Sequence, residues 1–438
     1  MSPDSLSPAL NTSNASEVII VGAGPAGLSM AIALADAGIR CTVLEQASLA
    51  SIADPQEDGR DIALTHRGRG VFEQLGAWAS IPPQEPAPLN AAHVSSGGGA
   101  SLLHFDTAGI GPLGFLVANH WLRRAVYEKA SNNPHISILT DARVEDVRVL
   151  PDETQVTLSN GGRLSAQLLI AADSRFSQTR RQVGIGCDML DFGRTVIVCR
   201  MALELEHHGI ARECFEIGHT LAILPMNGGQ ASVGLTVPSS RANEWLALDD
   251  AAFSQRVTAN FGASLGAMQA VAKRHAYPLV ATYAHRFVVP RVALLGDAAV
   301  GMHPVTAHGF NFGLYGVQVL GKLLLEAKQA GRDLGSLDVL EPYHREHRQT
   351  TWPIYQGTNV VVKWFTDDRP AVRVLRTGVL GFAEHFPPVK DAITRQLTGK
   401  KNPWLSVPDK LIPAHLVTQL QALRRDLKLP SPPWQRRG

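Results

Sequence analysis

Residues 17–46 read EVIIVGAGPAGLSMAIALADAGIRCTVLEQ, and this stretch decides the fold. The apolar run 18–21 predicts a buried parallel strand, and a glycine-rich turn follows it at once. A small-residue helix then runs through Ala35, and a second strand, 41–44, ends at an acidic residue. Strand, G-x-G-x-x-G turn, helix, strand and acid together form the dinucleotide-binding fingerprint in its full context.

Each glycine of this turn has its own task in the fingerprint. The first allows the tight turn, the second lets the backbone approach a pyrophosphate, and the third lets helix and strand pack closely. The acid can accept hydrogen bonds from a ribose and favours one without a 2′-phosphate. The predicted dinucleotide-binding residues are Gly22, Ala23, Gly24, Pro25, Ala26, Gly27 and Glu45. A second match, GIGPLG at 109–114, has no apolar strand before it and is predicted to bind no nucleotide.

Composition places the chain among globular proteins of two or three domains. It has 438 residues, 45% apolar and 18% charged, and a net charge of +2 argues against nucleic-acid binding.

The stretch 341–438 carries 16 Lys and Arg against 8 Asp and Glu, so it either touches an anionic surface such as lipid head groups or is a solvated face. Four cysteines without paired spacing predict no metal site. Residues 1–16 lack the features of a signal peptide, which predicts a disordered leader and a cytoplasmic protein.

Two later segments indicate which dinucleotide is bound. Residues 136–176 alternate strands and turns, and a three-stranded meander ending in an apolar strand and Asp173 is typical of FAD-binding folds. Residues 291–295 predict another strand, closed by Gly296 and Asp297 at the sheet edge where ligands bind. We expect Asp297 to hydrogen-bond the ribityl chain of FAD. Gly309, Phe310 and Asn311 begin a helix whose free N–H groups can face the flavin.

These motifs resemble the flavoprotein monooxygenases of aromatic rings, which have the para-hydroxybenzoate hydroxylase fold. The segments GRDIALTHRGRGVFEQLGAW, LGFLVANHWLRRAVYE, AADSRFSQTRRQVGI and GDAAVGMHPVTAHGFNFGL are similar to that family's motifs. The C-terminal LEPYHREHRQT and FTDDRPAVRVLRTGVLGFAEHFPPVKDAITRQLTG resemble its ubiquinone-biosynthesis branch, and within it the 5-demethoxyubiquinol hydroxylases. The likeness runs from about residue 18 to residue 399.

The resemblance implies a reaction. FAD is reduced by NAD(P)H, O₂ adds to give a flavin hydroperoxide, and an electron-rich phenolic ring takes its distal oxygen. Such chemistry needs a dry pocket and few protein acids or bases, because the cofactor carries the difficult step. The implied substrate is a polyprenylated ubiquinone precursor, which suggests contact with a membrane surface, on the inner face of the cytoplasmic membrane, and with a quinone-biosynthesis complex.

The resemblance also assigns residues. It adds Arg60, Arg124, Val144 and Asp173 to the cofactor-binding set, and it places His303, Pro304 and His308 beside the flavin, where the histidines either tune substrate ionisation or are loop residues. There are departures from the family pattern. Ser174 replaces a glycine in a motif that contacts both FAD and NADPH in the family. Val300 stands where the family has His or Gln, and His308 stands where Gln is common. Ala307 stands where Gly is common, and Gly316 stands where Asp is usual.

The predicted architecture is α/β, with an FAD-binding Rossmann-like domain, an inserted β-meander, a mixed-sheet substrate domain and a helical C-terminal region. The FAD-binding part comprises 17–75, 105–183 and 276–340, and the substrate part 76–104 and 184–275, with Leu224, Pro225 and Gly234 at the substrate or in the core. Residues 341–400 are predicted to be helical, as a membrane-contacting surface or a lid, with His344 and His347 on a solvated face, and 401–438 form an extension.

Two other functions remain open from the sequence. One is an O₂-independent, FAD-dependent reductase of the prenyl chain. The other is a non-catalytic scaffold of a quinone-biosynthesis complex, which Ser174 and Val300 suggest and the intact glycine motifs oppose. The ring carbon, the electron donor and the oligomeric state are not specified by the sequence.

Overall fold

The structure is a computed structural model, and it describes residues 16–96, 103–106, 111–216, 218–261, 265–304 and 308–365. The chain divides into two units, 1–400 and 401–438. The second unit, residues 366–400 and nearly all of the predicted leader lie outside the described residues.

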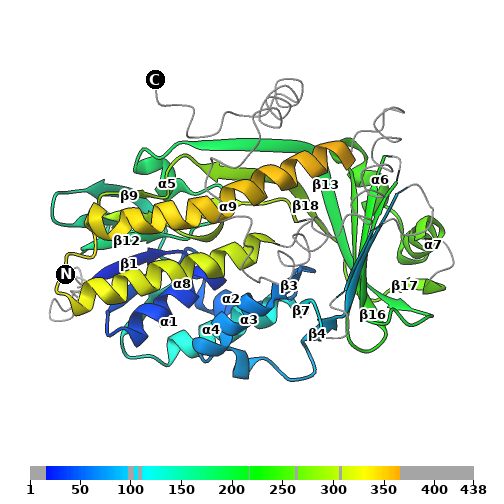
Figure 1. Cartoon of the computed structure of the whole chain (residues 1–438), viewed down its shortest axis with the longest axis horizontal. Helices are drawn as coiled ribbons and strands as arrows, with labels where there is room; N and C mark the ends of the chain where they lie inside the picture. Colours follow the sequence, from blue (N-terminus) through cyan, green and yellow to red (C-terminus); the bar gives the residue numbers. More distant parts are fainter. Residues whose placement is uncertain are drawn as a thin grey trace, which may run out of the picture. The chain divides into compact units, whose positions relative to one another are not determined.

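A sheet whose strands are parallel except for the edge strand β19 (Val288–Val289) carries the glycine fingerprint, in the left half of Figure 1. Its strands in spatial order are β19, β20 (Val292–Leu294), β12 (Leu168–Ala171), β1 (Val18–Val21), β2 (Cys41–Leu44) and β8 (Ile136–Leu139). The strands β1, β2 and β12 are buried along their whole length. Burial on both faces explains why these strands read as continuous apolar runs without alternation.

The helices α1 (Pro25–Asp36) and α8 (His308–Gln329) pack against each other (Figure 1). Small residues allow the close approach: a Cβ at Gly321 would lie 3.5 Å from the Cβ of Ala33, and one at Gly313 would lie 3.7 Å from that of Ala26. The helix α9 (Leu337–Phe365) packs on α8. The two glycine-marked helices are thereby held side by side.

A three-stranded meander is present, but the apolar run 168–171, predicted as its last strand, is β12 of the parallel sheet, and residues 163–166 form the third meander strand in its place. Its strands β9 (Val144–Val149), β10 (Thr154–Leu158) and β11 (Arg163–Ala166) pair antiparallel in sequence order. Apolar side chains of the meander pack with Ile19 and Leu169 on one side of the parallel sheet.

A second large sheet, referred to below as the substrate sheet, lies beside the parallel one (Figure 1). Its members are β5 (Ala91–Ser96), β6 (Leu103–Asp106), β13 (Cys187–Leu203), β14 (Ile210–Phe215), β15 (Thr220–Pro225), β16 (Gln230–Pro238), β17 (Met268–Ala270), β18 (His275–Ala284) and β21 (Val300–Gly301). The helices α6 (Ala242–Leu246) and α7 (Asp250–Phe261) cover one face through a cluster around Trp245 and Phe253.

A third, smaller sheet and several short elements complete the unit. The strands β3 (Asp61–Thr65), β7 (Gly114–Ala118) and β4 (Ala87–Leu89) form a separate antiparallel sheet. The remaining elements are α2 (Leu49–Ala53), α3 (His66–Gln74), α4 (Asn119–Ser131), α5 (Gln178–Gln182) and the short 3₁₀ turns Trp78–Ser80, Ser239–Arg241 and Gly296–Ala298.

The described part of the second glycine match, residues 111–114, runs into β7, and a Cβ at Gly114 would lie 2.4 Å from the carbonyl oxygen of Leu64 on β3. This glycine therefore serves antiparallel pairing.

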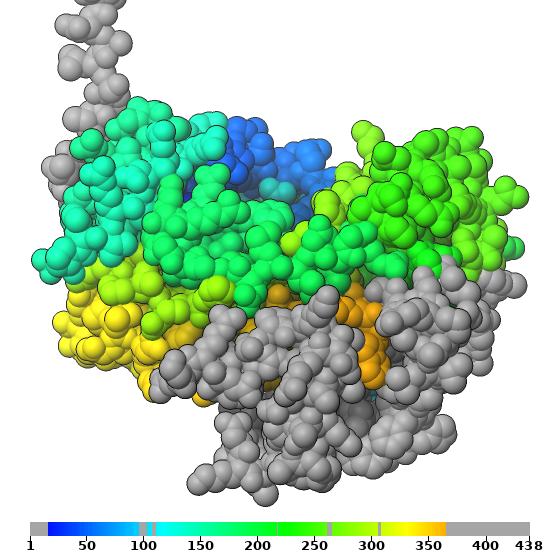
Figure 2. All heavy atoms as spheres, turned by 90° about the horizontal axis from the view of Figure 1, so that it is seen from above, coloured from blue at the N-terminus to red at the C-terminus, as the bar shows by residue number. Residues whose placement is uncertain are grey.

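Some predicted segments lie elsewhere than expected. The strand β18 starts at 275 and pairs with β13, so residues assigned to the FAD-binding part extend the substrate sheet. The prediction of a solvated His347 was wrong: this side chain is 1% exposed and stacks on Tyr343 with ring centroids 5.3 Å apart. Arg348 on the same helix donates to the carbonyl oxygen of Ala284, and Figure 2 shows α9, yellow to orange, next to green side chains of the substrate sheet.

Candidate active site

Two strand ends that are far apart in the sequence meet in the fold. A Cβ at Gly296 would lie 3.1 Å from the Cβ of Ala26, and Leu295 N–H donates to the carbonyl oxygen of Ala171 at 2.8 Å. Gly296 has φ +60°, a conformation that favours glycine. The glycine turn of α1 and the Gly-Asp turn after β20 therefore share one edge of the parallel sheet.

The three fingerprint glycines differ in the space around them. A Cβ at Gly22 would lie 2.5 Å from the carbonyl oxygen of Ala172, and one at Gly27 would lie 2.0 Å from that of Gly22. In the part of the chain that the structure describes, a Cβ at Gly24 would meet nothing within 4 Å. Gly24 is the N-cap of α1, whose first turn carries no acidic residue. The free N–H groups of that turn therefore open onto space that suits an anion such as a pyrophosphate.

Glu45 holds the turn in place at the end of β2. Its Oε2 accepts the N–H of Ala23 at 2.8 Å, and its Oε1 accepts the N–H of Ala47 at 2.9 Å. Its own carbonyl accepts the N–H of Ala142, two residues before Val144 at the start of β9. The predicted ribose contact, the glycine turn and the start of the meander thus lie together.

Arg124 lies on α4, beside the short helix α2. Its guanidinium is 3.0 Å from Glu128 one turn along and 3.8 Å from Asp54 at the end of α2.

Arg60 is half exposed, pairs with Asp58 through two guanidinium nitrogens and lies over the ring of Tyr277 at 5.6 Å. Burial alone would lower the pKa of Arg60, but Asp58 and, more weakly, Asp297 raise it above its ordinary value. The influence of the Asp297 charge on Arg60 indicates that this arginine lies on the side of the Gly-Asp turn.

Asp297 is held by residues that the sequence analysis did not single out. Arg175 donates to Asp297 Oδ2 at 3.0 Å and to the carbonyl oxygen of Val280 at 2.9 Å. Arg180 is 1% exposed and donates to the carbonyl oxygens of Ala298 at 2.8 Å and of Arg175 at 3.2 Å. Both arginines lie in AADSRFSQTRRQ, the segment that contains Asp173, so the quoted motif was the available signal.

Asp173 itself supports a helix end. It accepts the hydroxyl of Ser177 at 2.5 Å and the N–H of Thr179 at 3.1 Å, at the start of α5. Ser174, which stands where the family has glycine, has φ +83°. A left-handed backbone at this position explains why glycine suits it, and serine there carries a strain of about 1–2 kcal/mol.

The predicted residues beside the flavin have different environments. His303 is buried with its ring edge-on to Phe192 at 4.9 Å, and Pro304 is exposed. Burial, with the positive charges of Arg175 and Arg194, lowers the pKa of His303 to about 3. Its imidazole is therefore uncharged at neutral pH.

His308 opens α8 and is buried, with its ring 5.5 Å from that of Phe312. Phe310 packs near Phe72 at 6.2 Å. Among the described residues, a Cβ at Gly309 would meet only Met302 Cβ, at 3.9 Å.

Asn311 ties the same helix start to β3 and α3. Its Oδ1 accepts the N–H and the hydroxyl of Thr65, each at 3.0 Å, and its Nδ2 donates to the carbonyl oxygen of Ala63 at 2.9 Å. The side chain of Asn311 thus holds the helix N-terminus in place, and the backbone N–H groups are left as the predicted flavin contact.

Two departures from the family pattern have a packing reason. A Cβ at Gly316 would lie 2.9 Å from Leu295 Cδ1 and 3.3 Å from the hydroxyl of Tyr343, so an aspartate does not fit there. Val300 is 1% exposed and pairs with Tyr283 in the sheet, where an apolar, β-branched residue is suitable.

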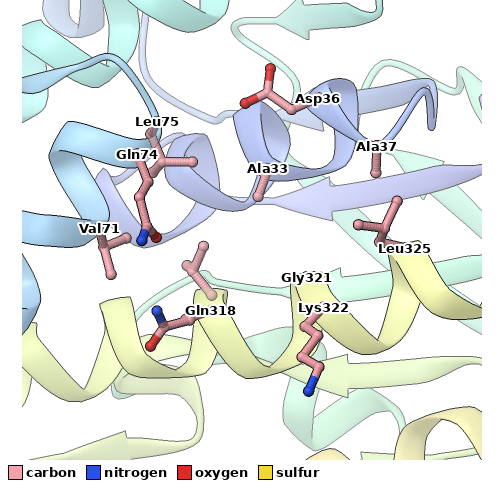
Figure 3. Close-up of a pocket in the computed structure, with 11 residues that line it drawn as sticks. Ala33, Asp36, Ala37, Val71, Gln74, Leu75, Gln318, Gly321, Lys322 and Leu325 are labelled. Atoms are coloured by element: carbon pink, nitrogen blue, oxygen red, sulfur yellow. The ribbon is translucent and has the colours of Figure 1, made fainter.

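A pocket of about 220 Å³ lies between α1, α3 and α8 (Figure 3). It is lined by residues such as Ala33, Asp36, Gln74, Gln318 and Lys322. Ala33 and Asp36 lie towards the C-terminal end of α1, so the pocket is distinct from the glycine turn at the other end of that helix.

Comparison with known proteins agrees with this geometry. Residues 15–358 match the family model described as FAD binding domain. The chain is 46% identical to ubiquinone hydroxylase UbiM of Neisseria meningitidis over 390 residues, which cover 88% of this chain and 85% of the relative. The chain belongs to the family of FAD-dependent ubiquinone hydroxylases. It is thus an FAD-dependent monooxygenase, and NAD(P)H is the typical electron donor in this family.

More distant relatives extend the same pattern. The chain is 34% identical to ubiquinone hydroxylase UbiL of Rhodospirillum rubrum, with 87% of this chain and 89% of the relative covered, and 26% identical to 3-demethoxyubiquinol 3-hydroxylase of Escherichia coli, with 85% and 96% covered. Its fold is similar to that of p-nitrophenol 4-monooxygenase PnpA from Pseudomonas putida, with a TM-score of 0.71, 20% identity, and 89% of this chain and 99% of that one covered.

The residues present fit FAD. The open space at Gly24, the helix N-terminus behind it, the carboxylate of Asp297 and the exposed Arg60 suit a pyrophosphate, a ribityl chain and a phosphate-facing cation. Within the described ranges, no group of three His, Cys, Asp or Glu side chains could hold a metal ion. No helix among the described residues is long and apolar enough to cross a membrane.

Proposed function

We propose that this chain hydroxylates the aromatic ring of a polyprenylated ubiquinone precursor, such as 5-demethoxyubiquinol. The observation that carries the proposal is the 46% identity to ubiquinone hydroxylase UbiM along nearly the whole chain. The fold supports the FAD binding that such chemistry needs, since two glycine turns lie at one edge of the parallel sheet.

Bound FAD supplies oxygen activation and two electrons, with NAD(P)H as the proposed donor. The protein supplies position and exclusion of water. Gly24 and the N-terminus of α1 would hold the pyrophosphate, with Arg60 as a cation beside it, and Asp297 would hold the ribityl hydroxyls. The backbone N–H groups of Gly309 and Phe310 would support negative charge on the reduced ring.

His303 is unsuited to deliver a proton, because burial keeps it uncharged at neutral pH. In this proposal it lines the buried side of the site as a neutral hydrogen-bonding group. Pro304, with no N–H and a fixed φ, would stiffen the loop beside the flavin.

The proposal includes a peripheral contact with the membrane and a place in a quinone-biosynthesis complex. The support is the chemistry of the substrate, whose prenyl tail partitions into lipid, and the basic composition of residues 341–438. Most of that stretch lies outside the described residues.

Lipid quinone analysis of a deletion strain tests the function. We expect an under-hydroxylated quinone to accumulate, and the native chain to restore the product while Gly24→Val does not. An unchanged quinone profile would contradict the proposal. A saturated prenyl chain in place of ring oxygenation would favour the reductase, and full complementation by Gly24→Val would favour the scaffold.

A further inference from the structure

Glu213 on β14 lies on the face of the substrate sheet that is turned away from α6 and α7. Side chains of a strand alternate between faces. Cys214 packs against the cluster under α6 and α7, whereas Phe215 belongs to the apolar cluster on the opposite face. Glu213 therefore shares the face of Phe215, away from the two covering helices.

The neighbours of Glu213 on this face are small or apolar. Glu213 is paired with Val94 on one side and with Ala222 on the other. The same row of paired residues continues from Ala222 to Gly234 and from Gly234 to Val198. Within the described part of the chain, no ion pair or hydrogen bond reaches the carboxyl group of Glu213. The residue as a whole keeps some exposure to solvent, but its carboxyl group is buried. Burial raises the pKa of Glu213 to about 8, so the carboxyl is mostly uncharged at neutral pH.

The same face meets the flavin-binding segment at its other end. Arg200 on β13 donates to Asp61 at 3.1 Å, and Tyr277 on β18 donates to the carbonyl oxygen of Asp58 at 2.6 Å. A Cβ at Gly59 would lie 2.8 Å from His275 Cδ2. This face is thus turned towards residues 57–61, the segment that contains Arg60.

Little side-chain bulk separates the two ends of the row. Between Glu213 and Val198 stand the methyl group of Ala222 and the bare backbone of Gly234. Three strand spacings amount to about 14 Å, a span that suits an aromatic ring with its substituents lying on the sheet.

We propose that the carboxyl group of Glu213 hydrogen-bonds an oxygen of an uncharged phenol or quinol ring and selects against rings that bear a carboxylate. This inference rests on the proposed function and adds a positioning and specificity residue to it. An uncharged acid in apolar surroundings gains a partner from a ring hydroxyl or methoxy group. A substrate carboxylate at the same place would be desolvated next to an acid and an apolar wall, which is unfavourable.

The test uses the purified FAD-loaded enzyme and two probes that differ only in a carboxylate, 2-prenylphenol and 3-prenyl-4-hydroxybenzoate. Binding is followed by the change in flavin absorbance, which requires no turnover. The native enzyme should bind the phenol at least tenfold more tightly. Glu213→Gln, which keeps a neutral hydrogen-bonding group, should stay within threefold, and Glu213→Leu should lose about tenfold for the phenol. Glu206→Gln, at an exposed carboxylate, is the matched control and should change nothing.

Thermal melting separates this role from a structural one. Leucine removes a carboxyl group from apolar surroundings, so Glu213→Leu should melt at or above the native temperature while binding more weakly. Native binding of the phenol by Glu213→Leu, or preference of the native enzyme for the benzoate, would overturn the inference. Hydroxylation of a quinol by the native enzyme tests the proposed function separately, because probe discrimination does not depend on it.

Discussion

Replacing Gly24 by alanine should weaken FAD binding strongly while the protein stays folded. Gly24 has φ −71° and ψ 174°, a backbone conformation that alanine adopts without strain, and its Cβ would meet nothing within 4 Å among the described residues. In the folded protein the added methyl group therefore occupies only the space in front of the helix N-terminus, where the pyrophosphate is proposed to lie.

The magnitudes follow from that geometry. Without FAD, Gly24→Ala should be neutral or stabilising by about 0.4–1 kcal/mol, because alanine restricts the unfolded chain. Displacing the pyrophosphate from one charge-assisted backbone hydrogen bond costs about 1.5–3 kcal/mol, which weakens the Kd by roughly 10-fold to 150-fold. Flavin fluorescence titration gives the Kd, and urea denaturation of the FAD-free protein gives the free energy of unfolding.

Gly27→Ala is the contrasting variant. Its Cβ would lie 2.0 Å from the carbonyl oxygen of Gly22, so helix and strand must separate, at a cost of about 1–3 kcal/mol or more even without FAD. Normal FAD affinity in Gly24→Ala, or native stability in FAD-free Gly27→Ala, would refute the assignment of the two glycines.

Three further predictions concern the surrounding residues. Ser174→Gly should raise the free energy of unfolding by about 1 kcal/mol in urea denaturation, because the position has φ +83°; an unchanged value would show that serine is unstrained there. Asp297→Asn should weaken FAD binding about tenfold in fluorescence titration, since it removes the charge that pairs with Arg175 at 3.0 Å; an unaltered Kd would remove Asp297 from the cofactor contacts. Burial lowers the pKa of His303 and of His347 to about 3, below the unfolded value of 6.5. Their contribution to stability is complete above pH 6.5 and is lost as the pH falls towards 3, about 2 kcal/mol for each histidine by pH 5. Urea denaturation at pH 7 and pH 5 of the native chain and of His347→Phe should show a smaller loss in the variant, and an equal loss would contradict the assignment.

The parallel sheet and the meander could be predicted because local sequence determines them. The strand 18–21, the glycine turn and the strand 41–44 appear in the structure at the predicted residues. Apolar runs and turn residues carry enough information for such elements. The meeting of the two glycine turns followed from a general rule, since parallel strands end at one edge of a sheet.

Contacts between distant segments could not be predicted in the same way. The motif that contains Arg175 does not indicate that its partner is Asp297, and nothing near Asp61 in the sequence indicates Arg200. The prediction that His347 is exposed was wrong, because residues three apart lie on the same side of a helix whether that side faces solvent or packs on another helix. The partners of long side chains depend on which segments lie close together in the fold, and a single sequence does not give that information.

The position of β20 has a consequence for how the protein is made. The strand β12 lies between β1 and β20, yet about 120 residues separate Ala171 at the end of β12 from Val292 at the start of β20. At ~5–20 residues per second, a ribosome needs roughly 6–24 s to cover that distance. During this interval the growing chain presents β12 as an unpaired, apolar edge, a template for aggregation. A chain released before residue 288 should therefore depend on chaperones far more than the full-length polypeptide, which pulse-chase solubility measurements can establish.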